Sequence, residues 1–415
     1  MRTSSIRRSR ARVTASAALG MLLVGIASVP AHAEGIRDQQ WQLDAFGAEE
    51  IWQLSTGKGV TVAVIDSGVE RNNPDLRGQV LEGKDFAPEE SGDQFTDYLG
   101  HGTGMAGLIA GTGARDGGNG AFGLAPGAKI LPVRVPGLEA GDGSKAESDK
   151  DFNRVVPPAI KYAADSGAKV INISLGATAG SPALTDAVKY ALDKGSLVFA
   201  AVGNSADKGN QTEYPAATPG VVGVGASDKK GKRITMSQFG PQVDLVAPGK
   251  DTVHACGGGT GLCKSTGTSE ATALASAAAA LLWAEHPDWT NNQVLKVMLN
   301  TIARPQGGEK RSDYIGFGAI RPLRTLKTPG DPGPADTRPI DDLAEAAPET
   351  PTATATDLPS ADPAPSESTP APAPAPQAAA AEDSGNTGLW IGLGIGAAVL
   401  IGAAVAVPAL RSRRN

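Results

Sequence analysis

The sequence predicts an α/β fold, in which a doubly wound and mostly parallel sheet is flanked by helices. Between residues 59 and 302, short apolar segments alternate with segments of helical character. The apolar segments are continuous, which is typical of parallel strands that are buried on both faces. About 290 residues, from 34 to 327, are available for this fold, and that length suffices for one large domain with a full core.

The strands are predicted from five apolar runs, taken in chain order. They are GVTVAVID at 59–66, AKILPVRV at 128–135, AKVINISLG at 168–176, SLVFAAVGN at 196–204 and GVVGVGAS at 220–227. Each run is short and apolar, as buried strands are. Ligands of such sheets bind beyond the carboxyl ends of the strands, so functional residues are expected there.

Helices are predicted in the segments between and after these strands, at 102–111, 151–166, 182–194, 268–286 and 290–302. The fourth helix contains an Ala-rich run at 271–280. Because that run has no polar face, the helix is expected to be buried on all sides in the middle of the domain.

The two ends of the chain predict export and membrane attachment. Residues 1–33 combine five arginines, an apolar stretch and the small-residue sequence AHA, as a signal peptide does. Residues 389–410 are 22 residues without a charge, and as a transmembrane helix they would be ~33 Å long. The basic tail 411–415 predicts a cytoplasmic C-terminus, with the folded domain outside the cell.

The remaining chain divides into a leader at 34–58, a folded domain at 59–327 and a linker at 328–388. The linker is rich in Pro, Ala and Thr and has almost no large apolar residue to bury, so it is expected to be disordered or extended. The formal net charge is −6 for the whole chain and −14 without the eight arginines at its two ends. This acidic balance does not indicate a nucleic-acid partner.

Three residues that together could make a nucleophilic catalyst occur at the predicted strand and helix ends. Asp66 ends the first strand, His101 lies at the start of the first helix, and Ser269 lies at the head of the Ala-rich helix. Singly, each has an ordinary structural role as a turn residue or helix cap. Together they can react, because serine needs a base, histidine titrates near neutral pH, and a carboxylate holds the histidine in the correct tautomer.

The order Asp–His–Ser and its surrounding motifs resemble those of the subtilase serine proteases. VAVIDSGVE, GHGTGMAG and GTSEATA are similar to the three catalytic motifs of that family. The resemblance implies a subtilisin-like fold and a serine endopeptidase that forms an acyl-enzyme on protein or peptide substrates, with Asp66, His101 and Ser269 as its triad. It implies no required cofactor. Subtilases often bind structural calcium, but no ligand set in this chain is spaced clearly enough to be assigned.

Two further segments extend the resemblance to substrate binding. FAAVGNS is similar to the strand whose asparagine donates to the oxyanion, which implies that role for Asn204. INISLG is similar to the strand that pairs with the substrate backbone. By this resemblance, the substrate-binding residues are Ser174, Leu175, Gly176, Ala201, Val202 and Gly203.

Three positions depart from the family pattern, one of them Ala273, where the family commonly has a proline four residues after the serine. Many subtilases have a second histidine where this chain has Gly104, and an apolar residue where Glu270 directly follows Ser269. The triad does not need a second histidine, so Gly104 indicates variation within the family. We hypothesise that the Glu270 carboxylate disfavours acidic residues just after the scissile bond.

The two cysteines, Cys256 and Cys263, allow two interpretations. A metal site would use His254 as a third ligand, but the spacing fits no common zinc pattern. In an exported protein a disulfide is the default, and it is the interpretation favoured here. No metal site is predicted.

The arrangement of the whole chain is similar to that of the mycosins, the membrane-anchored subtilases of type VII secretion systems. A signal peptide, the short leader RDQQWQLDAFGAEEIWQLSTGKG, a subtilase domain, a Pro-rich stalk and a C-terminal span are together typical of them. The resemblance implies an enzyme on the outer side of the cell membrane that processes proteins exported by the secretion system. The alternative is a structural subunit that stabilises the secretion complex, with proteolysis secondary.

Overall fold

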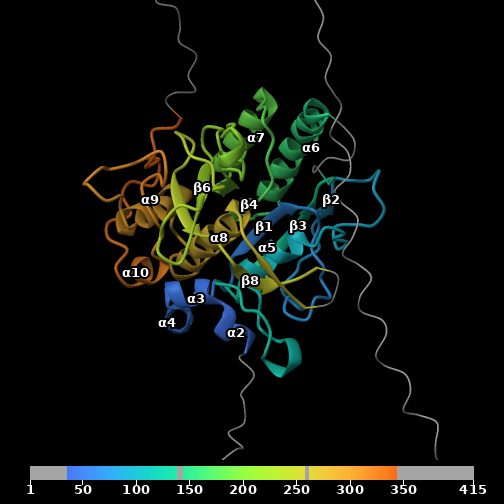
Figure 1. Cartoon of the computed structure of the whole chain (residues 1–415), viewed down its shortest axis with the longest axis horizontal. Coiled ribbons are helices and arrows are strands. Elements are labelled where there is room, and N and C mark those ends of the chain that lie inside the picture. The colour runs from blue at the N-terminus through green and yellow to red at the C-terminus, as the bar shows by residue number, and fades with distance from the viewer. Residues whose placement is uncertain (1–34, 138–143, 258–260, 344–415) are drawn as a thin grey trace, which may run out of the picture. The chain divides into compact units, whose positions relative to one another are not determined.

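The computed structural model describes residues 35–137, 144–257 and 261–343. A seven-stranded parallel sheet with the order β2-β3-β1-β4-β5-β6-β7 lies at the centre (Figure 1). The strands are β1 Thr61–Asp66, β2 Lys84–Asp85, β3 Lys129–Arg134, β4 Val170–Ile173, β5 Leu197–Ala201, β6 Val222–Ser227 and β7 Leu245–Pro248. After β1, the chain places β2 and β3 on one side of it and β4 to β7 on the other, so the strand order reverses at β1. A ligand crevice is expected at such a reversal, at the carboxyl ends of the strands.

Alternate residues of β1, β3, β4, β5 and β7 enter two separate hydrophobic clusters, one on each face of the sheet. In β1, Val62 and Val64 belong to the first cluster, whereas Ala63 and Ile65 belong to the second. Both faces of the strand are therefore buried, which explains why its sequence is apolar without alternation.

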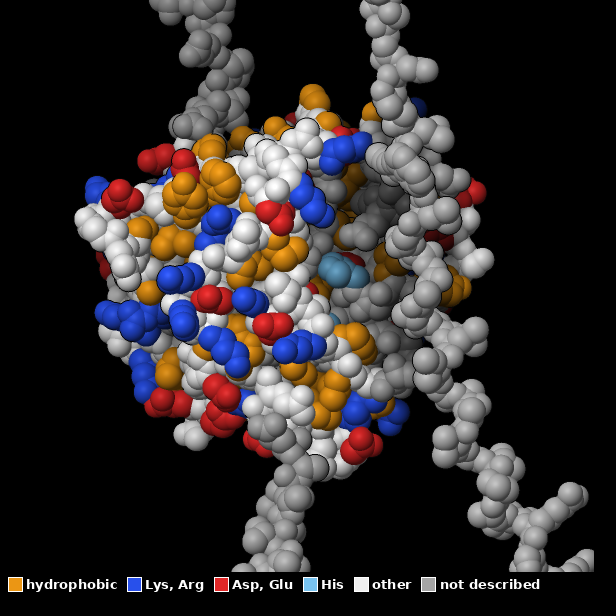
Figure 2. All heavy atoms as spheres, in the orientation of Figure 1, with side chains coloured by type: hydrophobic (Ala, Val, Ile, Leu, Met, Phe, Trp, Pro, Cys, Tyr) orange, Lys and Arg blue, Asp and Glu red, His pale blue; other side chains and the backbone are white. Residues whose placement is uncertain are grey.

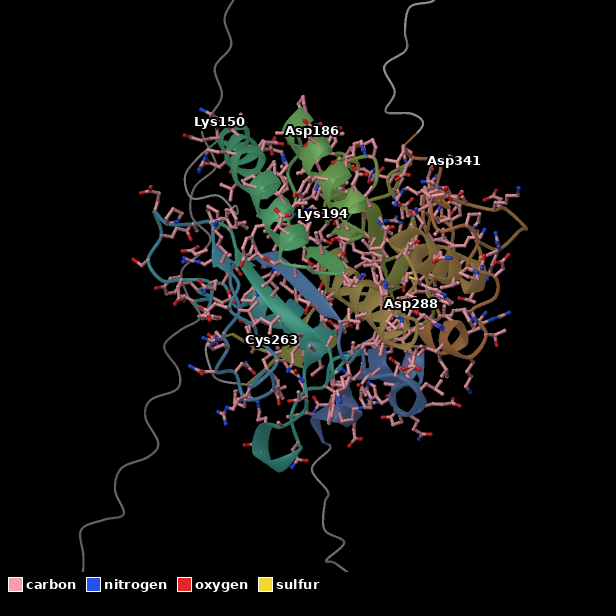
Figure 3. The ribbon with its side chains drawn as sticks, turned by 180° about the vertical axis from the view of Figure 1, so that it is seen from behind. Lys150, Asp186, Lys194, Cys263, Asp288 and Asp341 are labelled. Carbon is pink, nitrogen blue, oxygen red and sulfur yellow. A yellow bond between two sulfur atoms is a disulfide. The ribbon has the colours of Figure 1, made fainter. Side chains whose placement is uncertain are left out.

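Helices cover both faces of the sheet. The first face carries α5 His101–Ala110, α8 Thr268–Glu285 and α9 Asn291–Thr301, and the second carries α6 Lys145–Asp165 and α7 Pro182–Asp193. Figure 3, which views the opposite side, shows α6 with Lys150 and α7 with Asp186 lying side by side across the sheet. The fold is therefore the predicted mostly parallel, doubly wound α/β architecture.

The α8 helix lies in the middle of the domain, as predicted. It packs against β4, β5, β6 and β7 and against α5, and every residue from Thr268 to Trp283 is buried. Its many alanines let the helix lie close to the sheet and to α5 at the same time, because they have only a methyl group to accommodate.

Most of the predicted helices and strands are present, but they begin or end at residues that differ from the predicted ones. The strand predicted at 168–176 stops at Ile173, which leaves Ser174 and its successors as irregular chain at the sheet edge. The helix predicted at 151–166 begins earlier, at Lys145, with Ser144 at its N-terminal cap.

Several elements were not predicted. They are β2 and β7 of the main sheet, the antiparallel pair β8 Thr252–Ala255 and β9 Leu262–Ser265, the helices α2 Ile36–Gln39, α3 Trp41–Phe46, α4 Ala48–Leu54 and α10 Pro322–Lys327, and the short 3₁₀ helices Arg115–Gly117 and Ala206–Lys208. All are short, and β2 and the β8–β9 pair carry polar residues that weaken a strand pattern.

The leader is packed into the domain. Leu43 and Ile51 are fully buried in the first hydrophobic cluster. The amide Nε2 of Gln40 donates to the carbonyl oxygens of Phe122 and Val253, at 2.7 and 3.0 Å. The leader helices therefore stabilise the segment that contains β8.

The predicted boundary at 327 lies too early. Ile340 is 8% exposed within the first hydrophobic cluster, and the Gly220 N–H donates to Asp342 Oδ2 at 2.9 Å. The segment 328–343, predicted as the start of a disordered linker, therefore belongs to the folded domain, held by polar contacts that a composition argument does not detect.

The predicted signal peptide 1–33, the rest of the linker and the predicted span 389–410 lie outside the described residues. Within 35–137, 144–257 and 261–343, no helix combines the length and the apolar character needed to cross a bilayer.

Candidate active site

Asp66, His101 and Ser269 line one cleft at the carboxyl edge of the sheet. Asp66 is the last residue of β1, His101 is the first residue of α5, and Ser269 is the second residue of α8. The cleft has a volume of about 590 Å³, and the face in Figure 2 is hollowed beside a histidine side chain. The parallel sheet thus brings together three residues from segments far apart in the sequence.

His101 and Asp66 are directly hydrogen-bonded. The distance from His101 Nδ1 to Asp66 Oδ1 is 2.8 Å, and Asp66 is fully buried. The same oxygen accepts from the Ser67 N–H at 2.8 Å. Gly102 makes this approach possible, because a Cβ there would lie 2.2 Å from the Gly68 carbonyl oxygen and 3.0 Å from Asp66 Cβ.

Asp97 holds the start of α5 and was not predicted. Its Oδ1 accepts from the Gly100 N–H and from Ser67 Oγ, and its Oδ2 accepts from the Thr103 N–H, each at 2.8 Å. A carboxylate that bonds the free N–H groups of a helix start fixes that end of the helix. Asp97 lies three residues ahead of the N-cap Gly100, outside the position that a capping pattern identifies, so the sequence carried no signal for it.

The surroundings of His101 favour its protonated form. Burial acts to lower the pKa of His101, but the charge of Asp66 and its hydrogen bond outweigh burial. The more distant charges of Glu270 and Asp97 act in the same direction. The pKa of His101 is thereby raised to about 9.

Ser269 is held in a resting hydrogen bond. Its Oγ donates to the Ser174 carbonyl oxygen at 3.2 Å, and Ser174 Oγ donates to the Ser269 carbonyl oxygen at the same distance. No hydrogen bond joins Ser269 to His101 in the described part of the chain. A rotation of the serine side chain is needed before its proton can pass to the imidazole.

Asn204 is oriented so that its amide can donate into the cleft. Its Oδ1 accepts from the Thr268 N–H at 2.9 Å and from Thr268 Oγ1 at 3.2 Å. Because the oxygen is occupied by the start of α8, the Nδ2 group remains as the donor. Asn204 lines the cleft beside Ser269, whose own backbone N–H lies in the first turn of the same helix.

Five of the six predicted substrate-binding residues line the cleft, namely Ser174, Leu175, Gly176, Ala201 and Gly203. Val202 does not. It is fully buried in the second hydrophobic cluster, together with Val198 and Ala200. Successive residues of an extended chain point to opposite sides, so Val202 faces the core while its two neighbours face the cleft.

Glu270 also lines the cleft, although only 4% of it is exposed. Its Oε2 is buried and has no hydrogen-bond partner among the described residues. Burial without a partner is costly for a carboxylate, so this residue is an unusual feature of the site.

His254 lies against the position where many subtilases have a second histidine. A Cβ on Gly104 would come within 2.8 Å of His254 Cε1. His254 Nδ1 donates to the Ala255 carbonyl oxygen and Nε2 accepts from Ser265 Oγ, each at 2.7 Å. Burial lowers the pKa of His254, so this imidazole is favoured in its neutral form.

Cys256 and Cys263 form a disulfide, with their Cα atoms 5.2 Å apart. The alternative of a metal site that includes His254 is therefore wrong, because both thiols are used. Within the described ranges, no group of three or more His, Cys, Asp and Glu side chains is placed to hold a metal ion. The disulfide lies close to the turn before His101, since a Cβ on Gly257 would be 2.4 Å from the Cα of Gly100.

Comparison with known proteins agrees with this geometry. Residues 57–318 match the subtilase family of S8 peptidases. Thermitase of Thermoactinomyces vulgaris is 39% identical over 202 residues, which are 49% of this chain and 67% of thermitase. The major intracellular serine protease of Bacillus subtilis is 37% identical over 241 residues, 57% of this chain and 72% of that protease.

The solved structures that are similar to this one include two mycosins. The MycP3 protease from the type VII (ESX-3) secretion system superposes with a TM-score of 0.60 and 33% identity, over 69% of this chain and 87% of that one. MycP1 from Mycobacterium smegmatis superposes with a TM-score of 0.62 and 27% identity, over 74% and 89%. The chain therefore belongs to the subtilase family of serine endopeptidases, and its structural neighbours include the mycosins of type VII secretion systems.

Proposed function

We propose that this serine endopeptidase is anchored outside the cell membrane and processes proteins exported by a type VII secretion system. The observation that carries the chemistry is the 2.8 Å hydrogen bond between His101 Nδ1 and the buried Asp66, in the cleft that Ser269 also lines. The role in secretion is supported by the similarity to MycP3 and MycP1. The anchor is supported by the uncharged segment 389–410.

In this proposal, His101 is the general base. Its Nδ1–H is held by Asp66, so Nε2 is the nitrogen that takes the proton from Ser269 Oγ. The freed oxygen attacks the substrate carbonyl carbon, and Asp66 stabilises the imidazolium that results. Only the neutral imidazole can take the proton in this step. Because the pKa of His101 is raised to about 9, the neutral fraction grows as the pH rises toward 9, and the rate of the reaction should increase with it.

The oxyanion is assigned to two donors, Asn204 Nδ2 and the backbone N–H of Ser269. Both lie at the start of α8, where the helix dipole also favours negative charge. The imidazolium then protonates the leaving amine, and water releases the acyl group by the reverse sequence of proton transfers. Ser174, Leu175, Gly176, Ala201 and Gly203 are proposed to hold the acyl part of the substrate.

A fluorophosphonate probe tests the catalytic assignment. We expect covalent labelling at Ser269 in the full chain, no labelling of Ser269→Ala, and strongly slowed labelling of His101→Ala. Absence of labelling in the folded wild-type protein would contradict the assignment.

Comparison of exported proteins tests the biological role. Three strains are compared, which carry the wild-type chain, the Ser269→Ala variant or a deletion of the whole gene. We expect a few exported proteins to be cleaved in the wild-type strain and to stay uncleaved in the other two. If Ser269→Ala secretes and processes like wild type while the deletion does not secrete, the structural-subunit alternative is correct.

A further inference from the structure

We propose that Glu213 makes this protease select a Lys or Arg side chain on the acyl side of the scissile bond. The inference rests on the proposed peptidase function of the cleft, and it names the class of substrate that the cleft prefers. Glu213 was not identified from the sequence, because it lies in irregular chain between the 3₁₀ helix at 206–208 and β6.

Glu213 lies against two glycines of the cleft wall. A Cβ on Gly176 would be 2.8 Å from Glu213 Oε2, and a Cβ on Gly203 would be 2.6 Å from Glu213 Cδ. All three residues line the same cleft as Ser269. Because residues 176 and 203 are glycines, there is space beside them for the Glu213 carboxylate at the wall of the cleft.

One oxygen of Glu213 positions the carboxylate, and the other is available. Oε1 accepts from Gln238 Nε2 at 2.6 Å and from Ser205 Oγ at 3.3 Å. Oε2 has no hydrogen bond in the described part of the chain, and it is not among the buried atoms that lack a partner. The two donors are neutral, so they orient the group without cancelling its charge.

No cation of the described chain pairs with Glu213. Lys145, at the start of α6, acts on it only at a distance, and the carboxylate of Asp149 is bonded to the backbone N–H and hydroxyl of Thr178. A half-buried carboxylate without a counter-ion attracts a cation from outside, because in its low-dielectric surroundings the attraction is less screened than in water.

The position of Glu213 identifies which substrate residue it meets. Asn204 is assigned to the oxyanion of the acyl group, and Gly203 and Ser205 are its chain neighbours on the cleft wall. The leaving amine instead departs toward His101, which donates the proton to it. The side chain next to Glu213 therefore belongs to the residue that contributes the acyl group.

A set of peptides that differ only in that residue tests the inference. We expect kcat/KM to be about 10- to 100-fold higher for Lys or Arg than for Gln or Leu, and lowest for Glu, as a charge-assisted contact would give. Glu213→Gln should remove the preference for Lys over Gln, and Glu213→Lys should favour Glu. The exposed Glu309→Gln serves as a matched control and should keep the wild-type order.

Labelling of Ser269 by a small fluorophosphonate, measured on the same preparations, separates the possible failures. Normal labelling of wild type with equal cleavage after Lys, Gln and Leu would overturn this inference and leave the protease function standing. A Lys preference that persists in the labelled Glu213→Gln variant would also overturn it. No labelling of wild type would overturn the proposed function, and this inference with it.

Discussion

His101 lies near two different kinds of carboxylate. Asp66 is bonded to it and determines which nitrogen faces the cleft. Glu270 contributes only charge, since no hydrogen bond joins it to His101 in the described residues, yet it also raises the pKa of the imidazole. Glu270, which directly follows Ser269, therefore raises the pKa of His101 without a hydrogen bond to it.

Replacing Glu270 by Gln should lower the pKa of His101. The neutral amide no longer stabilises the imidazolium, so the rise of kcat/KM with pH should begin at lower pH than in wild type, whose His101 has its pKa raised to about 9. A pH–rate profile with a neutral peptide substrate measures this shift. The exposed Glu309→Gln should leave the profile in place, and an unchanged profile in Glu270→Gln would show that the charge of Glu270 does not reach the base.

At the scale of elements, a short hairpin supports the start of α5. The strands β8 and β9 pair with His254 opposite Cys263, and the disulfide joins the end of β8 to β9. The carbonyl oxygen of Cys256 accepts from Asn73 Nδ2 at 2.7 Å. Because Gly257 lies against Gly100, the hairpin limits how far the turn before His101 can move.

Removal of the disulfide should therefore affect both stability and rate. The double variant Cys256→Ser, Cys263→Ser should lose about 2–3 kcal/mol of unfolding free energy, the amount expected for a small closed loop. Its kcat should fall as well, because His101 is less firmly placed. Thermal unfolding and peptide hydrolysis with and without reductant measure both effects. Reductant should change wild type and leave the variant as it was, and equal sensitivity of the two would contradict the prediction.

The elements that could be predicted are the regular ones. β1, α5 and α8 have long apolar or Ala-rich sequences, and they carry Asp66, His101 and Ser269 at their ends. Asp97 and Glu213 could not be predicted in this way, and Glu270 could be singled out in the sequence but its burial could not, because these features depend on three-dimensional surroundings. The first two come from irregular chain whose path is set by tertiary hydrogen bonds, and the burial of Glu270 follows from the packing of other segments around α8.

At the scale of the whole molecule, both ends of the described chain stabilise its centre. In the leader, Gln40 donates to the Val253 carbonyl oxygen in β8, and in the segment up to 343, Asp342 accepts from the Gly220 N–H just ahead of β6. Asp342 in that segment contributes to the electrostatic surroundings of Asp244, which directly precedes β7. The stability of the sheet is thus coupled to a segment that its composition assigned to a linker.

The buried Asp244 should make the stability of the protein depend on pH. Its Oδ2 accepts from the Gly223 N–H at 2.8 Å. Burial nevertheless raises the pKa of Asp244 from 3.8 to about 7, with Asp342 acting in the same direction and the more distant Arg338 and Arg311 opposing it. Between these two values the folded state holds a proton that the unfolded state has lost. The contribution of this group to stability is therefore fully present below about pH 4 and is lost as the pH rises through about 7.

Asp244→Asn keeps an acceptor for the Gly223 N–H and cannot ionise. The wild-type protein should lose up to about 4 kcal/mol of unfolding free energy from this group between pH 4 and pH 8, whereas the variant should not. Urea unfolding of both proteins at pH 4 and pH 8 measures the difference, with the exposed Asp288→Asn as the matched control. The unfolding free energy of the variant should rise relative to that of wild type as the pH rises. In wild type, Asp244 must ionise while it is buried, and its single backbone hydrogen bond does not fully offset the cost of desolvating that charge. Parallel pH dependence in wild type and variant would mean that Asp244 stays ionised in the fold, with Arg311 and Arg338 supplying the compensation.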